Sequence, residues 1–254
     1  MSTPRFVPRT EFPVEHRPWP LARGPWVMAQ TWHDLLFAHW PVPASSMRAL
    51  VPHELEIDTY EGSAWIGVVP FRMSAVRLRG MPGVPGMRAF PELNLRTYVR
   101  VGQKPGVWFF SLDAANSPAV AIARAWFDLP YFRARMRCDP RGDDVDYDSE
   151  RTHTGARAAT WRGVFGPRGS VELARPGSLE HWLTERYCLY ARSKRGRLTR
   201  GEIHHAPWPL QPAHAEVEAD TIAAAAGITL VGRAPSLVFA RRLDVRIWAP
   251  RRVE

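Results

Sequence analysis

The chain has 254 residues, 45% of them hydrophobic and 11% aromatic, which is enough for one sizeable core. No apolar run approaches the roughly 20 residues that span a bilayer, and the N-terminus has no apolar signal segment, so we expect a cytoplasmic protein with no membrane partner. The net charge of +9 comes almost wholly from scattered arginines, without a basic helix or finger motif, so no nucleic-acid partner is expected. Cys138 and Cys188 form no disulfide framework and no CxxC pair.

The first half of the chain predicts an arm followed by strands. Residues 1–25 contain six prolines and should form an extended arm over the folded body. The elements expected after it are a strand-like segment (26–40), a short helix (43–52), a hairpin turning at Glu61-Gly62 (55–73), a Gly- and Pro-rich loop (79–94) and two strands (92–101 and 106–114).

A helix is predicted over 117–129. Ser117 suits its N-cap and Pro118 its first position, and Val120 and Phe127 are apolar. Pro130 should end it and fix the direction of the side chains that follow.

The second half predicts further antiparallel pairs. The expected elements are two paired strands (131–140 and 145–153), a hairpin (158–166 with 170–175), a short helix capped by Ser178, strands near Tyr187 and over 197–208, a helix ended by Gly227 (212–228) and a final strand (236–250). Strands and helices do not alternate regularly, so the sequence predicts an α+β, mainly antiparallel fold, with a curved or closed sheet and a few short helices. We expect a single domain over 1–254, because no repeat or linker interrupts the chain.

The common cofactor motifs do not occur. The sequence has no GxGxxG after a strand, no P-loop, no GxSxG and no HExxH. No cofactor is therefore expected.

The segment "IHHAPWPLQPAH" contains His204, His205 and His214. Neighbouring strand residues face opposite ways, so His204 and His205 would need a bulge to share a metal, and no metal site is expected. We predict that one of these two histidines, His205 by preference, has only a structural role, with one of the pair inside the barrel and the other near the surface. His204 remains a candidate acid or base.

Two further polar segments are candidates. In "LTERYCLYAR", Glu185 and Tyr187 share a strand face; they would either transfer a proton or form a structural ion pair with an arginine. In "FPELNLRTYVR", a second set alternates along one face: Glu92, Asn94, Arg96 and Tyr98. That face borders either solvent or a polar cavity, and buried-looking neighbours favour the cavity.

The order of these segments resembles the YqjF-like family, a bacterial domain of unknown function, over roughly residues 17–250. The run from Glu92 to Pro130 is also distantly similar to acetoacetate decarboxylase. That resemblance implies a cone-like antiparallel barrel with an internal pocket, and it matches Glu92 to the decarboxylase glutamate. In acetoacetate decarboxylase two lysines follow the matching proline, and one of them forms a Schiff base with the substrate.

Here Tyr131 and Phe132 follow Pro130, and neither can form an imine. The only two lysines, Lys104 in a turn and Lys194 in a basic run, are not placed to replace them. We therefore expect Pro130 to direct Tyr131 and Phe132 into the pocket, where they either fill it or, in the case of Tyr131, donate a hydrogen bond.

Two functions from different classes fit these residues. One is a cofactor-free enzyme of lyase or isomerase type for a small carbonyl or carboxylate compound, with Arg96 holding the anion, Glu92 as general base, and Tyr131 and His204 as proton donors. The other is a non-catalytic binding or sensing protein. Its affinity would come from aromatic residues, namely Trp108, Phe109, Tyr131 and Phe132. The apolar content would permit a homo-oligomer.

Overall fold

The computed structural model describes residues 13–81, 89–116, 120, 127–193 and 195–253. These residues form a 14-stranded sheet with short helices. The strands of its first half are β1 (Met28–Val42), β2 (Glu56–Ile57), β3 (Ala64–Leu78), β4 (Ala89–Val101), β5 (Lys104–Ala114), β6 (Tyr131–Arg141) and β7 (Asp144–Arg151). Those of its second half are β8 (Thr160–Pro167), β9 (Glu172–Leu173), β10 (Cys188–Arg192), β11 (Leu198–His204), β12 (Pro209–Asp220), β13 (Ser236–Ile247) and β14 (Arg251–Arg252). The helices are α1 (Ala44–Arg48), α3 (Leu179–Thr184) and α4 (Ile222–Ala225).

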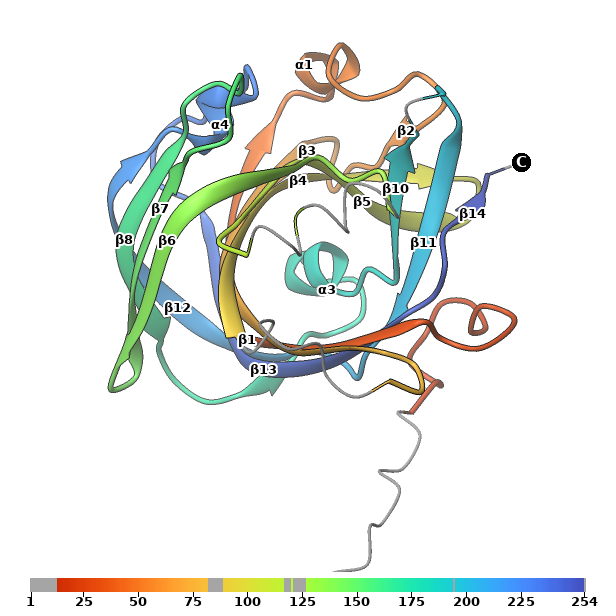
Figure 1. Ribbon diagram of the computed structural model, residues 1–254, viewed down its shortest axis with the longest axis horizontal. Coiled ribbons are helices and arrows are strands. Elements are labelled where there is room, and N and C mark those ends of the chain that lie inside the picture. Colours follow the sequence, from red (N-terminus) through yellow and green to blue (C-terminus); the bar gives the residue numbers. More distant parts are fainter. Residues whose placement is uncertain (1–12, 82–88, 117–119, 121–126, 194, 254) are drawn as a thin grey trace, which may run out of the picture.

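The sheet closes on itself in two rings that share β1, β3 and β4. The first ring runs β4–β5–β10–β11–β13–β1–β3 and back to β4; the second leaves β5 through β6, β7, β8 and β12 and returns at β13. Figure 1 looks into the first ring, with β6, β7, β8 and β12 to its left. Most pairings are antiparallel, but β5 pairs in parallel with both β6 and β10. The fold is thus a closed, mixed β-barrel, and the predicted fold class is confirmed.

The rings diverge because two strands have different partners along their length. Val107 and Trp108 at the start of β5 pair with β10, whereas Leu112 near its end pairs with β6. In the same way, Ala240 on β13 pairs with β12, and Ile247 pairs with β11. The shared β1–β3–β4 sheet therefore has one face in each ring.

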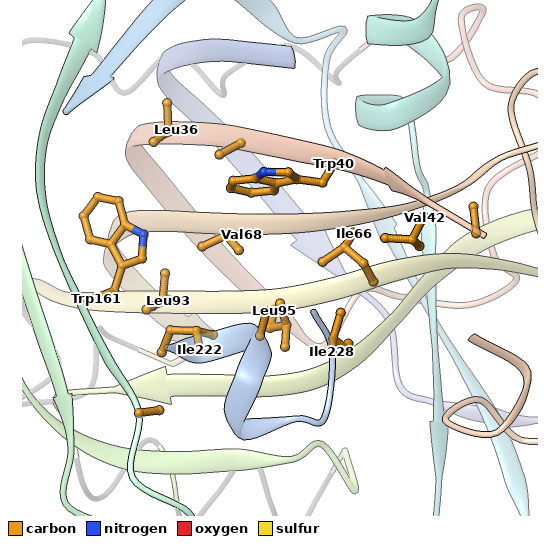
Figure 2. Close-up of a cluster of buried hydrophobic side chains, with 14 of the residues drawn as sticks. Leu36, Trp40, Val42, Ile66, Val68, Leu93, Leu95, Trp161, Ile222 and Ile228 are labelled. Atoms are coloured by element: carbon orange, nitrogen blue, oxygen red, sulfur yellow. The ribbon is translucent and has the colours of Figure 1, made fainter. Parts of the chain in front are cut away.

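The second ring encloses a core that we call the dry core. Leu93 and Leu95 of β4 point into it, together with Trp161 of β8 and Ile222 of α4 (Figure 2). All four side chains are at most 1% exposed. Burial of this apolar surface is the main source of the stability of the sheet.

Two β-bulges, one in β1 and one in β3, change which side chains of these long strands face the first ring. Asp34 on β1 and Ala75 on β3 have positive φ values of 52° and 50°, and the β1–β3 register shifts around both. A bulge adds one residue to a strand, so side chains three positions apart can face the same way. Trp32 and Leu35 accordingly line one cavity despite their odd spacing.

Two segments contact the ends and the outside of the first ring. The helix α3, inside the ring in Figure 1, packs Leu183 against Trp65, Tyr98 and Val107 and so covers one end of it. Ser178 caps this helix as predicted, accepting a hydrogen bond from the backbone N–H of His181 at 3.2 Å.

Of the predicted N-terminal arm, the structure describes only the part from residue 13 onward. Arg17 donates to the carbonyl oxygen of Ile203 at 2.8 Å, and the indole of Trp19 donates to Glu202 at 3.2 Å. This part of the arm therefore contacts β11 from outside the ring.

Three predicted elements are wrong or altered. Residues 212–228, predicted as a helix, form most of β12 and only the short α4, because pairing with β8 and β13 outweighs the helix propensity of alanine. The segment 158–166 pairs with β7 and β12 instead of 170–175, whose short β9 pairs with β12. The turn at Glu61-Gly62 is present, but β2 pairs with β4 and not with β3.

The other predicted strands are confirmed within a few residues, including β1, the β6–β7 pair and the final β13. Most of the predicted helix 117–129 lies outside the described residues. Of it, Val120 and Phe127 are described as buried. Within the described residues, no helix has the length and apolar character needed to cross a membrane.

Candidate functional site

The first ring encloses a cavity of about 150 Å³. Most of the side chains that line it are apolar or aromatic. They come from β1, β3, β4, β5, β6, β10, β11 and β13, from the segments that flank β10 and β11, and from Phe127 and Leu129 just before β6. Its polar lining residues are few, and they are the candidates for chemistry.

The cavity face of β4 carries three of the predicted site residues. Glu92, Asn94 and Arg96 line the cavity, at the alternate spacing of one strand face. The fourth predicted residue, Tyr98, is fully buried beyond the cavity, where its hydroxyl contacts His39.

Glu92 is a buried carboxyl group without a cation. Its side chain accepts a hydrogen bond from the hydroxyl of Tyr131 at 3.0 Å, and no described cation forms an ion pair with it. Burial raises the pKa of Glu92 to about 8, and the charge of Asp113 adds to the rise. The carboxyl group is therefore mostly protonated at pH 7. Burial and the neighbouring Glu92 also raise the pKa of Tyr131 well above its usual value.

Arg96 is the reverse case, a cationic group without a carboxylate partner among the described residues. It lies 5.3 Å from the ring of Phe37 and donates to the hydroxyl of Tyr98 at 3.2 Å and to the carbonyl oxygen of Leu183 at 3.4 Å. No carboxylate of the described residues lies within ion-pair distance of its guanidinium. Arg96 thus supplies a positive charge to the cavity that only neutral groups contact.

His39 stabilises Arg96 through Tyr98. Its Nε2 atom lies 2.6 Å from the Tyr98 hydroxyl, whose oxygen accepts a hydrogen bond from Arg96. Burial and the charge of Arg96 hold the pKa of His39 well below its ordinary value, so the ring is neutral. The hydroxyl of Tyr98 is thereby oriented with its oxygen toward Arg96.

A second arginine, Arg186, also lines the cavity. Arg186 is buried and pairs with Asp58 at 2.5 Å, and its Nε donates to the carbonyl oxygen of Trp182 at 2.6 Å. Burial lowers the pKa of Arg186, while Asp58 opposes the shift.

The two neighbouring histidines are placed opposite to the expectation. His205 lines the cavity, whereas His204 faces the arm, with its Nδ1 3.3 Å from Arg17 and its ring 5.8 Å from that of His16. Both are buried, so the prediction that one is near the surface is wrong. Alternation along β11 places Ile203 and His205 on the inner face, and the sequence could not show which face was inner.

Glu185 and Tyr187 meet, but outside the cavity and not on a strand. Glu185 is the C-cap of α3, accepting from the Tyr187 hydroxyl and, at 2.9 Å, from the backbone N–H of Trp208. The strand β10 begins only at Cys188, so Thr184 and Arg186 face the cavity instead.

Two predicted aromatic residues also lie elsewhere. Tyr131 lines the cavity, but the next residue on β6, Phe132, faces the other way and packs against Arg151 at 4.2 Å. Trp108 lines a separate groove and not the cavity, while Phe109 lines both. Pro130 therefore directs one side chain inward and not two.

No lysine is among the described residues that line the cavity. The amine of Lys104 pairs with Glu202 at 3.1 Å, and Lys194 lies outside the described residues. In the part of the chain that the structure describes, no group of three or more His, Cys, Asp or Glu side chains is arranged to hold a metal ion.

The polar residues of the cavity that the sequence analysis did not place there include Arg186, His205 and Trp208. The signal for His205 was present, because its segment was singled out and alternation required one of two histidines to point inward. Arg186 and Trp208 lie in loops, and the sequence does not show which way their side chains point.

The arrangement of the strands is that of the acetoacetate decarboxylase-like fold. The chain is similar to acetoacetate decarboxylase from Legionella pneumophila, with a TM-score of 0.60, 13% identity, and 94% and 93% of the two chains covered. It is also similar to the enduracididine biosynthesis enzyme MppR, with a TM-score of 0.62, 12% identity, and 96% and 98% covered. These likenesses define the fold alone.

The family follows from the sequence. Residues 29–244 match DUF2071, a family of uncharacterised conserved proteins, and the chain belongs to it. It is 49% identical to the uncharacterised protein YqjF of Bacillus subtilis over 229 residues, which are 90% of this chain and 93% of the relative.

Proposed function

We propose that the protein binds a small carboxylate or carbonyl compound in the cavity and moves a proton on it without a cofactor. The observation that carries the proposal is the pairing of two groups in one apolar enclosure: Arg96, which has no described carboxylate partner, and Glu92, which has no described cation. A cavity of this size admits a ligand of roughly six to ten non-hydrogen atoms.

Each group has a role that follows from its surroundings. Arg96 would hold the anionic end of the ligand, and the low dielectric of the apolar lining strengthens that attraction. Glu92 is protonated at pH 7 and would first act as a proton donor, becoming a base as the pH rises through about 8. The hydroxyl of Tyr131 would hold the carboxyl group of Glu92 in place. This differs from the general-base role expected of Glu92 from the sequence.

A protein of the same fold supports the class of ligand. MppR has been observed in complex with pyruvate, a small 2-oxo acid. We do not propose imine-dependent decarboxylation, because no lysine is among the described residues that line the cavity.

Solvent exchange tests the catalytic part of the proposal. We expect the wild-type protein to accelerate replacement of the protons next to the carbonyl of 2-oxobutanoate by deuterium, followed by NMR in D₂O. Glu92→Gln keeps the size and the hydrogen bond acceptor and should lose most of the acceleration, by about 100-fold or more. Glu218→Gln, at an exposed position on β12, is the matched control. Equal rates for Glu92→Gln and the wild type would overturn the proposal.

Binding tests the part assigned to Arg96. Calorimetry with the same 2-oxo acid should show about a 10- to 100-fold weaker affinity for Arg96→Met, which keeps the length of the side chain and removes its charge. An unchanged affinity would remove Arg96 from the site.

The second candidate is a binding or sensing protein, which the mostly apolar and aromatic lining of the cavity favours. On this alternative the Arg96 dependence of binding remains, but neither the wild type nor Glu92→Gln accelerates exchange. The two experiments together therefore separate the two functions.

A further inference from the structure

We infer that the ligand carries a hydrogen-bond donor, a hydroxyl or an N–H group, in addition to its anionic group, and that Nε2 of His205 accepts this bond. The inference rests on the proposed binding of a small carboxylate in the cavity. It narrows that class to acids that carry a hydroxyl or an N–H group, with or without a carbonyl group.

The tautomer of His205 is fixed by the backbone. Its Nδ1 atom lies 2.7 Å from the carbonyl oxygen of Ala206. A carbonyl oxygen only accepts, so Nδ1 must carry a proton. Burial lowers the pKa of His205, and the backbone groups of Ala206 and Arg186 only partly oppose that shift, so the ring is neutral and its Nε2 atom carries a lone pair.

That lone pair has no partner among the described residues. His205 is 0% exposed, its Nε2 atom is buried without a hydrogen bond, and the residue lines the cavity. The ring itself is held in place, stacked on Tyr187 at 4.7 Å and packed against Trp208 at 5.3 Å. A buried acceptor in a rigid ring is satisfied by whatever occupies the space beside it.

The other polar atoms of the cavity complete the pattern. Nε1 of Trp208, Nε of Arg96 and Nη2 of Arg186 are donors, and Oδ1 of Asn94 is an acceptor; all four are buried without a hydrogen bond among the described residues. Donors can receive the oxygens of a carboxylate. The acceptors His205 and Asn94 cannot, because their lone pairs would face those of the carboxylate. They require a hydrogen that the ligand brings.

The rest of the lining limits the size of the ligand. Trp208 is stacked against Trp32 at 6.0 Å and meets Phe37 edge-on at 4.9 Å, so the wall beside His205 is aromatic. A ligand with an anionic group, one donor and a short apolar chain matches this lining. A branched 2-hydroxy acid is a compound of this kind.

Three matched acids test the inference by calorimetry: 2-hydroxy-4-methylpentanoate, its 2-oxo counterpart and 4-methylpentanoate, which has neither oxygen at that carbon. The wild type should bind the hydroxy acid about 10-fold or more tightly than the other two. His205→Phe removes the acceptor and should abolish this preference, while changing the affinity for 4-methylpentanoate by less than about 3-fold.

Two variants serve as controls. His204→Gln alters the neighbouring ring that faces the arm and should keep the preference. His205→Gln supplies another acceptor and should keep part of it, and together with the wild-type ranking it decides the matter if His205→Phe fails to fold.

The outcomes separate this inference from the proposed function. If the wild type binds all three acids equally in an Arg96-dependent manner, or if His205→Phe keeps the preference, the inference is overturned and the carboxylate site stands. If the wild type binds none of the acids, both are overturned.

Discussion

The two faces of the shared β1–β3–β4 sheet have opposite character, although alternate residues of the same strands build them. On β4, Leu93 and Leu95 point into the dry core, while Glu92 and Arg96 point into the cavity. Buried polar groups without partners destabilise a fold, whereas the dry core stabilises it. One face of the sheet therefore provides most of its stability, and the other face can carry polar groups suited to a ligand.

Two buried carboxyl groups on neighbouring strands show the same difference. Asp113 of β5 is fully buried and accepts two hydrogen bonds from Arg151, at 2.8 and 3.0 Å. Among the described residues, the side chain of Glu92 on β4 has one hydrogen-bond partner, the hydroxyl of Tyr131. Asp113 is part of a structural ion pair, whereas Glu92 forms no ion pair with a described residue.

The largest expected effect lies in the dry core. Trp161 is 1% exposed and packs against Tyr147 and Phe165. Trp161→Ala should lower the free energy of unfolding by about 3–5 kcal/mol in urea titrations, because it leaves a cavity that cannot collapse. Val231→Ala, at an 84% exposed position, should change it by less than about 0.5 kcal/mol. A loss below about 1 kcal/mol for Trp161→Ala would contradict the role given to the dry core.

An effect of similar size is expected from the pH dependence of Glu92. Its pKa is about 8 in the folded protein against an ordinary 4.5, so the folded state binds more protons than the unfolded state between these values. The contribution of Glu92 to stability is therefore fully present below pH 4.5 and is lost as the pH rises through 8, by up to about 5 kcal/mol. Glu92→Gln removes this loss. In urea titrations at pH 5, 7 and 9, the free energy of unfolding of the variant should therefore increase relative to that of the wild type as the pH rises.

The exposed Glu218 provides the control for that series, since Glu218→Gln should follow the wild type at every pH. Parallel curves for Glu92→Gln and the wild type would mean that Glu92 stays ionised in the folded protein. The contrast with Asp113 would then be lost.

A smaller effect is expected where a glycine makes room for the cavity network. A Cβ atom at Gly67 would lie 2.9 Å from Nε2 of His39, a buried ring that is hydrogen-bonded to Tyr98. In thermal unfolding, Gly67→Ala should lower the free energy of unfolding by about 1–3 kcal/mol, because the added methyl group overpacks the site. At Gly201 the nearest atom would be the flexible Leu189 side chain at 3.4 Å, so Gly201→Ala should be close to neutral in the same thermal unfolding experiment. Equal costs at both positions would show that the network is not packed tightly.

The fold class could be predicted from the sequence because strand signals are local. Alternation over β4 and the turn at Glu61-Gly62 are visible in a few residues. The error at 212–228 arose because alanine favours a helix locally, while the pairing of β12 with β8 depends on residues about 50 positions away. Nothing in a short window contains that information.

The site was predictable only in part, for a geometrical reason. The alternation of Glu92, Asn94 and Arg96 placed these residues on one face, and the resemblance suggested that the face borders a pocket. For pairs such as Tyr131 and Phe132, or His204 and His205, alternation shows that one residue points inward but not which one. That choice is set by the partner strands, in particular by the divergence of the two rings at β5 and β13.

The smallest effect should be confined to the end of the cavity. The hydroxyl of Ser178 accepts from the backbone N–H of His181, and α3 carries Leu183 and Thr184 against the first ring. Ser178→Ala should destabilise this helix by about 1 kcal/mol. The amides of α3 should then exchange with solvent about 5-fold faster. The amide of Trp161 in the dry core should be unaffected, because α3 can open without the second ring. Equal acceleration in both regions would show that the two rings open together, and the separation of a stabilising face from a ligand face would then not extend to their motions.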